Sequence, residues 1–125
     1  CLTASLAAGA PTAVPTPGTT MAGMDCAQVS AAAWPTLQRG VDGTVTVDDD
    51  EVHAAMAELA GIGLAIGDCG AAPLAALRAL AVDPRCGALR TAIGFGPRAR
   101  ALLVATEGVT DPAAYRTVLR AASRV

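Results

Sequence analysis

The sequence predicts an α/β fold, in which helices cover a mainly parallel sheet in three αβα layers. Helical patterns alternate along the chain with short apolar or β-branched runs, as they do when helices connect parallel strands. The run Leu102–Ala105 is apolar throughout and is followed by turn residues, which is typical of a strand buried on both faces. Pro112 after Asp111 then opens a helical pattern. Together these segments predict strand, turn and helix.

The composition fits one small domain with an aliphatic core. The chain has 125 residues, of which 53% are hydrophobic, and only Trp34, Phe95 and Tyr115 are aromatic. A net charge of −2 without a basic cluster gives no electrostatic reason to expect a nucleic acid or an anionic membrane as partner. All nine basic residues are arginine, so the chain has no lysine.

Neither a metal site nor a membrane segment is expected. The single histidine accompanies four cysteines that have no CxxC spacing: Cys1, Cys26, Cys69 and Cys86. We find no leader pattern and no apolar run of transmembrane length, and we expect a reduced, cytoplasmic protein. The chain opens on Cys1 within a helical pattern, so we expect it to begin inside a longer reading frame.

The first 18 residues are predicted to form a helix end and a connection rich in proline, threonine and glycine. Gly9 should stop the helix, and residues 19–125 are assigned to the α/β domain. Ser30 is a candidate N-cap for a helix that contains Trp34, and Pro35 should delay its start or kink it.

A strand and a capped helix are predicted next. Thr44–Val47 is rich in β-branched residues and should form a strand. Asp48 and Glu51 have the spacing of a capping box, and Val52 and Met56 begin the apolar face of the helix that follows. Because acidic residues favour a helix N-terminus, we assign no metal to this cluster.

The remaining elements continue the alternation of helix and strand. Gly61–Ile66 is interpreted as a loop that leads into a strand, and the helix after it should end at Asp83-Pro84. A short helix and a glycine-rich connection are expected over residues 90–101.

Three turns, taken in order, resemble one family. They are Met21-Ala22-Gly23-Met24-Asp25-Cys26, Gly67-Asp68-Cys69-Gly70-Ala71-Ala72 and Ala105-Thr106-Glu107-Gly108-Val109-Thr110-Asp111-Pro112. The chain is similar to the C-terminal part of pyridoxal-phosphate enzymes of the tryptophan-synthase β-like fold (fold type II), and within them to diaminopropionate ammonia-lyase. The most discriminating piece is Thr-Glu-Gly-x-Thr-Asp-Pro-x-x-Tyr, from Thr106 to Tyr115.

The resemblance implies a cofactor site. Thr106 stands where these enzymes hold the pyridine nitrogen of pyridoxal phosphate with a hydroxyl or thiol, and a neutral donor there does not force protonation of the ring. Asp68 matches an acidic residue near the ring, where relatives usually have glutamate followed by serine. The turn at Ala22 and Gly23 would form a wall of the cofactor cleft, so residues 19–125 would be the C-terminal part of the cofactor-binding domain.

The resemblance also implies an activity that this chain does not perform alone. The family eliminates ammonia from 2,3-diaminopropionate, a small amino acid, and yields pyruvate and a second ammonia. The Schiff-base lysine and the glycine-rich phosphate loop lie upstream of the matched region, and the chain has no lysine. Covalent cofactor attachment is therefore impossible here, and no catalytic residue is assigned. The complete enzyme is expected to be a homodimer.

Two other functions stay open. The chain could be a non-enzymatic α/β domain that binds a partner or ligand, or a segment of another β-eliminating lyase such as a threonine or serine dehydratase. Each residue also has a structural explanation: Thr106 and Asp68 could cap helices, and Cys69 could simply pack.

Overall fold

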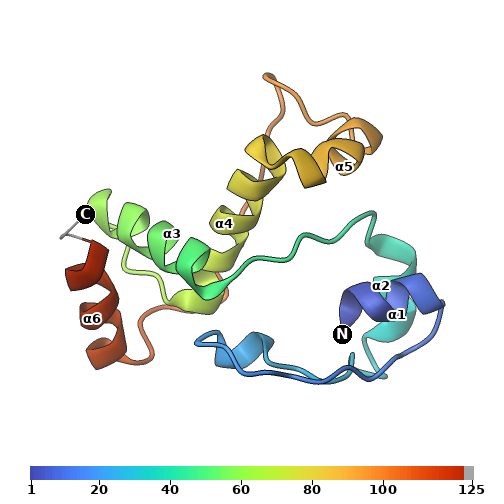
Figure 1. Cartoon of the computed structure of the whole chain (residues 1–125), viewed down its shortest axis with the longest axis horizontal. Coiled ribbons are helices and arrows are strands. Elements are labelled where there is room, and N and C mark those ends of the chain that lie inside the picture. The colour runs from blue at the N-terminus through green and yellow to red at the C-terminus, as the bar shows by residue number, and fades with distance from the viewer. Residues whose placement is uncertain (123–125) are drawn as a thin grey trace. The chain divides into compact units, whose positions relative to one another are not determined.

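The computed structural model describes residues 1–122, whose regular structure is entirely helical (Figure 1). The chain divides into two compact units, Cys1–Thr44 and Val45–Val125. The first unit contains α1 (Leu2–Ala8), the 3₁₀ helix η1 (Ala22–Met24) and α2 (Trp34–Gly40). The second contains α3 (Asp49–Gly61), α4 (Asp68–Val82), the 3₁₀ helix η2 (Pro84–Cys86), α5 (Gly87–Ala92) and α6 (Pro112–Ala122).

In the first unit, α1 ends as predicted at Gly9. Gly9 has a φ of 69°, in the left-handed region where glycine meets no steric penalty. The backbone N–H of Thr12 donates to the hydroxyl of Ser5, at 2.9 Å, and Ser5 is fully buried. This bond fixes the proline-rich connection against the helix that it leaves.

The rest of the first unit has little regular structure. The helix predicted around Trp34 begins at Trp34 itself, with Pro35 in its first turn, where the missing N–H costs least. Ser30 starts the turn before it, because the N–H groups of Ala33 and Trp34 both donate to the Ser30 carbonyl. Met21 and Val29 are the buried apolar residues of this unit.

The second unit is built around α3, which contacts both α4 and α6 (Figure 1). The predicted capping box is confirmed: the N–H of Glu51 donates to Asp48 Oδ1 and the N–H of Asp48 donates to Glu51 Oε2, both at 2.9 Å. The buried face of α3 consists of Val52, Ala55 and Met56, and that of α4 is mostly alanine: Ala71, Ala72, Ala75 and Ala79. Small side chains on one helix allow the two backbones to approach closely.

The ends of α4 and α6 also follow the sequence. Asp83 ends α4, and its side chain accepts from the N–H of Arg85 at 2.7 Å. At the start of α6, Asp111 Oδ1 accepts from the N–H groups of Ala113 and Ala114, at 2.8 and 3.0 Å. These hydrogen bonds satisfy donors that a helix cannot pair internally.

The predicted α/β fold with a parallel sheet is wrong, because no strand occurs among residues 1–122. Thr44–Val47 and Leu102–Ala105 are irregular, and of Gly61–Ile66 the first residue ends α3 and the rest is irregular. Leu102 and Val104, expected to be buried, are 89% and 61% exposed.

The failure has a physical cause. An extended segment becomes a strand only when a neighbouring segment pairs with its backbone N–H and C=O groups. In the described part of the chain, no backbone hydrogen bond involves residues 101–106. A run of apolar residues indicates that a segment suits a sheet, but not that a second strand lies beside it.

None of the described helices is long and apolar enough to cross a membrane.

Candidate functional site

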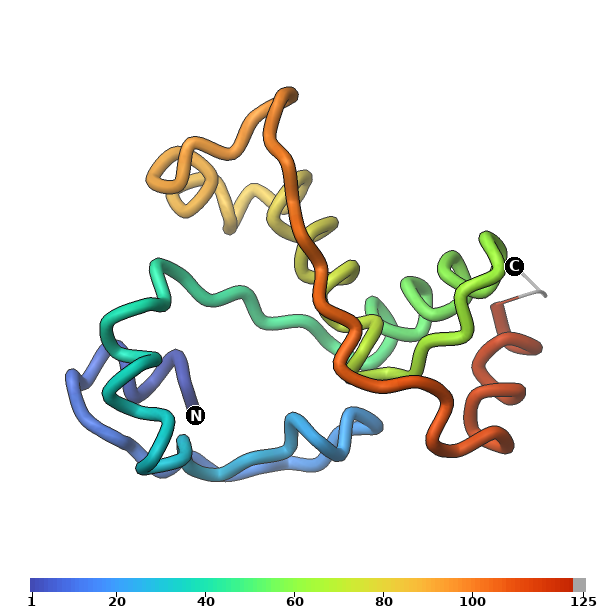
Figure 2. Tube along the Cα trace, turned by 180° about the vertical axis from the view of Figure 1, so that it is seen from behind, coloured from blue at the N-terminus to red at the C-terminus, as the bar shows by residue number. Residues whose placement is uncertain are grey.

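The turn after residue 105 packs against the N-terminus of α4. Figure 2 shows the chain from residue 100 onward (orange) passing the start of this helix. A Cβ added to Gly67 would stand 2.5 Å from the carbonyl oxygen of Gly108, and one added to Gly70 would stand 2.6 Å from that of Glu107. Both distances are too short for a side chain. Glycine at these positions therefore permits direct contact between the turn and the helix.

Glu107 makes the polar contact between the two segments. The backbone N–H of Cys69 donates to Asp68 Oδ1 at 2.8 Å and to Glu107 Oε1 at 3.0 Å. Two carboxylates thus share one N–H at the positive end of the α4 dipole, where negative charge is stabilised. Glu107 and Cys69 are 38 residues apart in the sequence, so this hydrogen bond is a tertiary contact.

The same residues form a compact cluster of polar atoms. A carboxylate oxygen of Asp68, the sulfur of Cys69 and a carboxylate oxygen of Glu107 all lie within 4.8 Å of one another. Cys69 is 7% exposed, and the two acids are half-buried. Oxygen and thiolate donors at this spacing suit a cation. In this structure, however, both carboxylates accept a hydrogen bond from the Cys69 N–H at the start of α4.

Two of the four predicted cofactor-binding residues meet at this place. Asp68 is the first residue of α4, and Thr106 directly precedes Glu107 and is exposed. Ala22 and Gly23 lie in η1 of the other unit and are exposed, and their place in a cofactor cleft stays a prediction. The structural explanation considered for Asp68 also holds, since its carboxylate accepts at the helix start.

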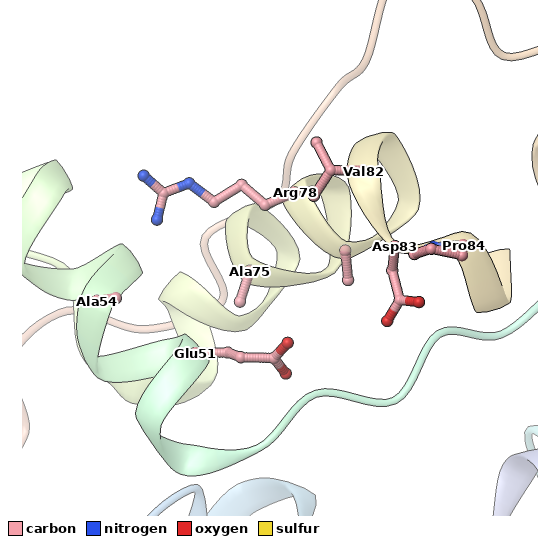
Figure 3. A pocket seen from close by; sticks show the side chains of 8 residues that line it. Glu51, Ala54, Ala75, Arg78, Val82, Asp83 and Pro84 are labelled. Atoms are coloured by element: carbon pink, nitrogen blue, oxygen red, sulfur yellow. The ribbon is translucent and has the colours of Figure 1, made fainter.

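A hollow of about 460 Å³ lies between α3 and the C-terminal part of α4. Figure 3 shows the carboxylates of Glu51 and Asp83 pointing into it. Both are engaged elsewhere, Glu51 in the capping box and Asp83 with the guanidinium of Arg85, at 2.6 and 2.8 Å. The hydrogen bonds from the side chain and then the backbone of Arg85 hold the pKa of Asp83 below its ordinary value.

This hollow is remote from the turn. Asp68 and Asp83 stand at opposite ends of α4, and a helix of 15 residues is about 22 Å long. The turn and the start of α4 are therefore the better candidate site.

A family model described as "Pyridoxal-phosphate dependent enzyme" matches residues 1–106. The match covers most of the chain and includes Ala22, Gly23, Asp68 and Thr106. The chain belongs to this family. No curated protein matches the chain, and no solved structure does either.

Members of this family depend on pyridoxal phosphate, and the residues at the turn fit one end of that cofactor. The exposed Thr106 offers a neutral hydroxyl donor, which suits a pyridine nitrogen. The phosphate end does not fit at the start of α4, because two carboxylates already occupy the N–H of Cys69. No lysine is present in these 125 residues to attach the cofactor.

Glu107 is not among the cofactor-binding residues that the sequence predicts. An acid next to the expected ring-nitrogen donor was visible in the sequence, as was the helix start at Asp68. Their contact was not, because no sequence pattern relates a carboxylate to a backbone N–H 38 positions away.

Proposed function

We propose that this chain is the C-terminal segment of a pyridoxal-phosphate-dependent ammonia-lyase that acts on 2,3-diaminopropionate. The complete enzyme would convert the substrate and one water into pyruvate and two ammonia molecules. Membership of the family supports the cofactor. The observation that supports the site is the contact between the turn carrying Thr106 and the start of α4, where Asp68 lies.

In this proposal the chain's residues hold the ring of the cofactor and do not react. The Thr106 hydroxyl would donate to the pyridine nitrogen, and Asp68 would lie near the ring. Because the hydroxyl is neutral, it leaves the ring nitrogen without a full positive charge. When bound, the cofactor would supply the electron sink, and a ring nitrogen left neutral by Thr106 would temper that sink and favour loss of the β-amino group. The attaching lysine would come from a longer polypeptide.

The test uses the product of the whole reading frame that encodes this chain. The purified protein, loaded with pyridoxal phosphate, should release pyruvate and ammonia in a ratio of one to two from 2,3-diaminopropionate. The 125-residue chain alone, which has no lysine, is the matched control and should release neither. If the whole product is inactive on this substrate although it binds the cofactor, the proposed substrate is wrong.

Parallel assays distinguish the runner-up reaction. A threonine or serine dehydratase would release one ammonia per turnover from threonine or serine and leave 2,3-diaminopropionate unchanged. The same preparation tests the expected homodimer, since light scattering after size exclusion should give twice the mass of the polypeptide.

A further inference from the structure

The turn that carries Thr106 has few anchors besides Glu107. On its N-terminal side, residues 101–105 are exposed, and no backbone hydrogen bond in the described chain involves them. On its C-terminal side, α6 begins only at Pro112. Between them, the carboxylate of Glu107 accepts from the Cys69 N–H at the start of α4, and the backbone of Glu107 packs against Gly70.

The hydrogen bond of Glu107 is more than the capping of α4 requires. The Cys69 N–H is already satisfied by Asp68 Oδ1, the shorter of its two bonds at 2.8 Å. The start of the helix would thus keep a side-chain acceptor without Glu107. What the second acceptor adds is a connection between two segments 38 residues apart.

The two glycines make this connection specific in position. Gly67 lies against the carbonyl of Gly108, and Gly70 lies against the carbonyl and the N–H of Glu107. A backbone held on one side by a charge-assisted hydrogen bond and on the other by close packing has little freedom. Thr106 precedes Glu107 directly, so its location is fixed by the same contacts.

We infer that Glu107 is a positioning residue, whose carboxylate, bound to the Cys69 N–H, fixes the turn so that the Thr106 hydroxyl stands at the pyridine nitrogen. This inference rests on the role proposed for Thr106. It differs from a capping role, because a cap would stabilise α4 without controlling the hydroxyl.

The test compares Glu107→Ala with Glu107→Gln in the whole gene product. Glutamine keeps an oxygen that can accept from the Cys69 N–H, and alanine does not. The matched control is Asp48→Ala, which removes a helix cap of the same kind from α3. Two readouts are used: backbone ¹⁵N relaxation order parameters over residues 105–108 in the cofactor-free protein, and the ¹⁵N resonance of ring-labelled pyridoxal phosphate in the loaded protein.

Glu107→Ala should lower the backbone order parameters over residues 105–108 from about 0.85, typical of a rigid backbone, to below about 0.6, and should displace the ring-nitrogen resonance. Glu107→Gln should stay close to the wild type in both readouts. Asp48→Ala should lower stability but leave both unchanged. The inference is overturned if Glu107→Ala leaves the resonance in place, or if Asp48→Ala displaces it equally.

Gly70→Ala provides a second route if Glu107→Ala does not fold. Its methyl group would stand 2.6 Å from the Glu107 carbonyl oxygen and push the turn away with Glu107 intact. It should reproduce the displaced resonance, whereas Gly87→Ala, whose methyl group would meet nothing nearer than 3.7 Å, should not. An undisplaced resonance in Gly70→Ala contradicts the inference. Neither readout requires lyase activity, so an inactive protein would refute the proposed substrate and still decide the role of Glu107.

Discussion

The α3–α4 pair and the segment 101–105 are both apolar and belong to the same unit, but the facing sides of the helices are buried and the segment is exposed. Val52 and Ala55 of α3 and Ala71 of α4 are fully buried. Leu102, in the extended segment, is 89% exposed, although its side chain is larger than any of these. Hydropathy alone therefore does not decide which apolar residues of this chain enter the core.

The difference lies in where the backbone finds its hydrogen bonds. A helix pairs its N–H and C=O groups within itself, so α3 and α4 need only bury one face against each other. An extended segment needs a second segment at its side before its backbone and its side chains can both leave water. The helices α3 and α4 therefore satisfy their backbone groups internally, whereas the apolar run at 101–105 stays in contact with water.

The largest difference in the free energy of unfolding is expected when one large apolar side chain in each region is truncated to alanine. Met56→Ala empties a site that is 4% exposed and should lower the free energy of unfolding by about 2–5 kcal/mol. Leu102→Ala removes a similar volume from an exposed site and should change it by less than about 0.5 kcal/mol. Urea unfolding followed by circular dichroism measures both. Similar losses would show that residues 101–105 are buried in solution.

Proline substitution tests the backbone itself. Ala57→Pro, in the interior of α3, removes a helical hydrogen bond and should cost about 3 kcal/mol or more. Leu103→Pro should be nearly neutral, because no backbone hydrogen bond in the described chain involves residue 103. A strong loss at position 103 in the same urea experiment would mean that this segment is paired.

A smaller effect is expected at the helix caps, which distinguish α3 from α4. Asp48→Ala removes a local acceptor three residues before Glu51 and should cost about 1 kcal/mol. Asp48→Asn should recover most of that loss, since asparagine is also a favourable N-cap. If alanine and asparagine destabilise the protein equally in thermal unfolding, the capping box contributes through charge and not through its hydrogen bond.

The smallest effect concerns pH at the start of α6. The N–H groups of Ala114 and then Ala113 hold the pKa of Asp111 below its ordinary value of 3.8. Since the folded-state pKa is the lower one, the contribution of this carboxylate is fully present above that value and is lost as the pH falls through the folded-state pKa. An NMR titration should show residues 112–122 losing helicity in this acid range. Asp111→Asn should abolish the dependence, and its persistence would assign it to another acid.

The helical elements were largely readable from the sequence because their signals are local. The box of Asp48 and Glu51, the stop at Gly9 and the start at Asp111-Pro112 each depend on residues within one turn of the chain. The apolar face of α3 was likewise predicted at Val52 and Met56.

The strands and the complete site were not readable, because they depend on distant segments. A β-branched or apolar run such as Leu102–Ala105 carries no information about whether a second segment lies beside it. The order of the turns indicated Thr106 and Asp68, but not the hydrogen bond between the Cys69 N–H and the carboxylate of Glu107.

By itself, the sequence determined where helices begin and end and which family the chain resembles, since caps and motifs are written in adjacent residues. The tertiary structure alone decided that the extended runs form no sheet within residues 1–122 and that Glu107 reaches the N–H of Cys69. Both depend on the same physical fact: a backbone N–H or C=O outside a helix takes its partner from wherever the folded chain places one.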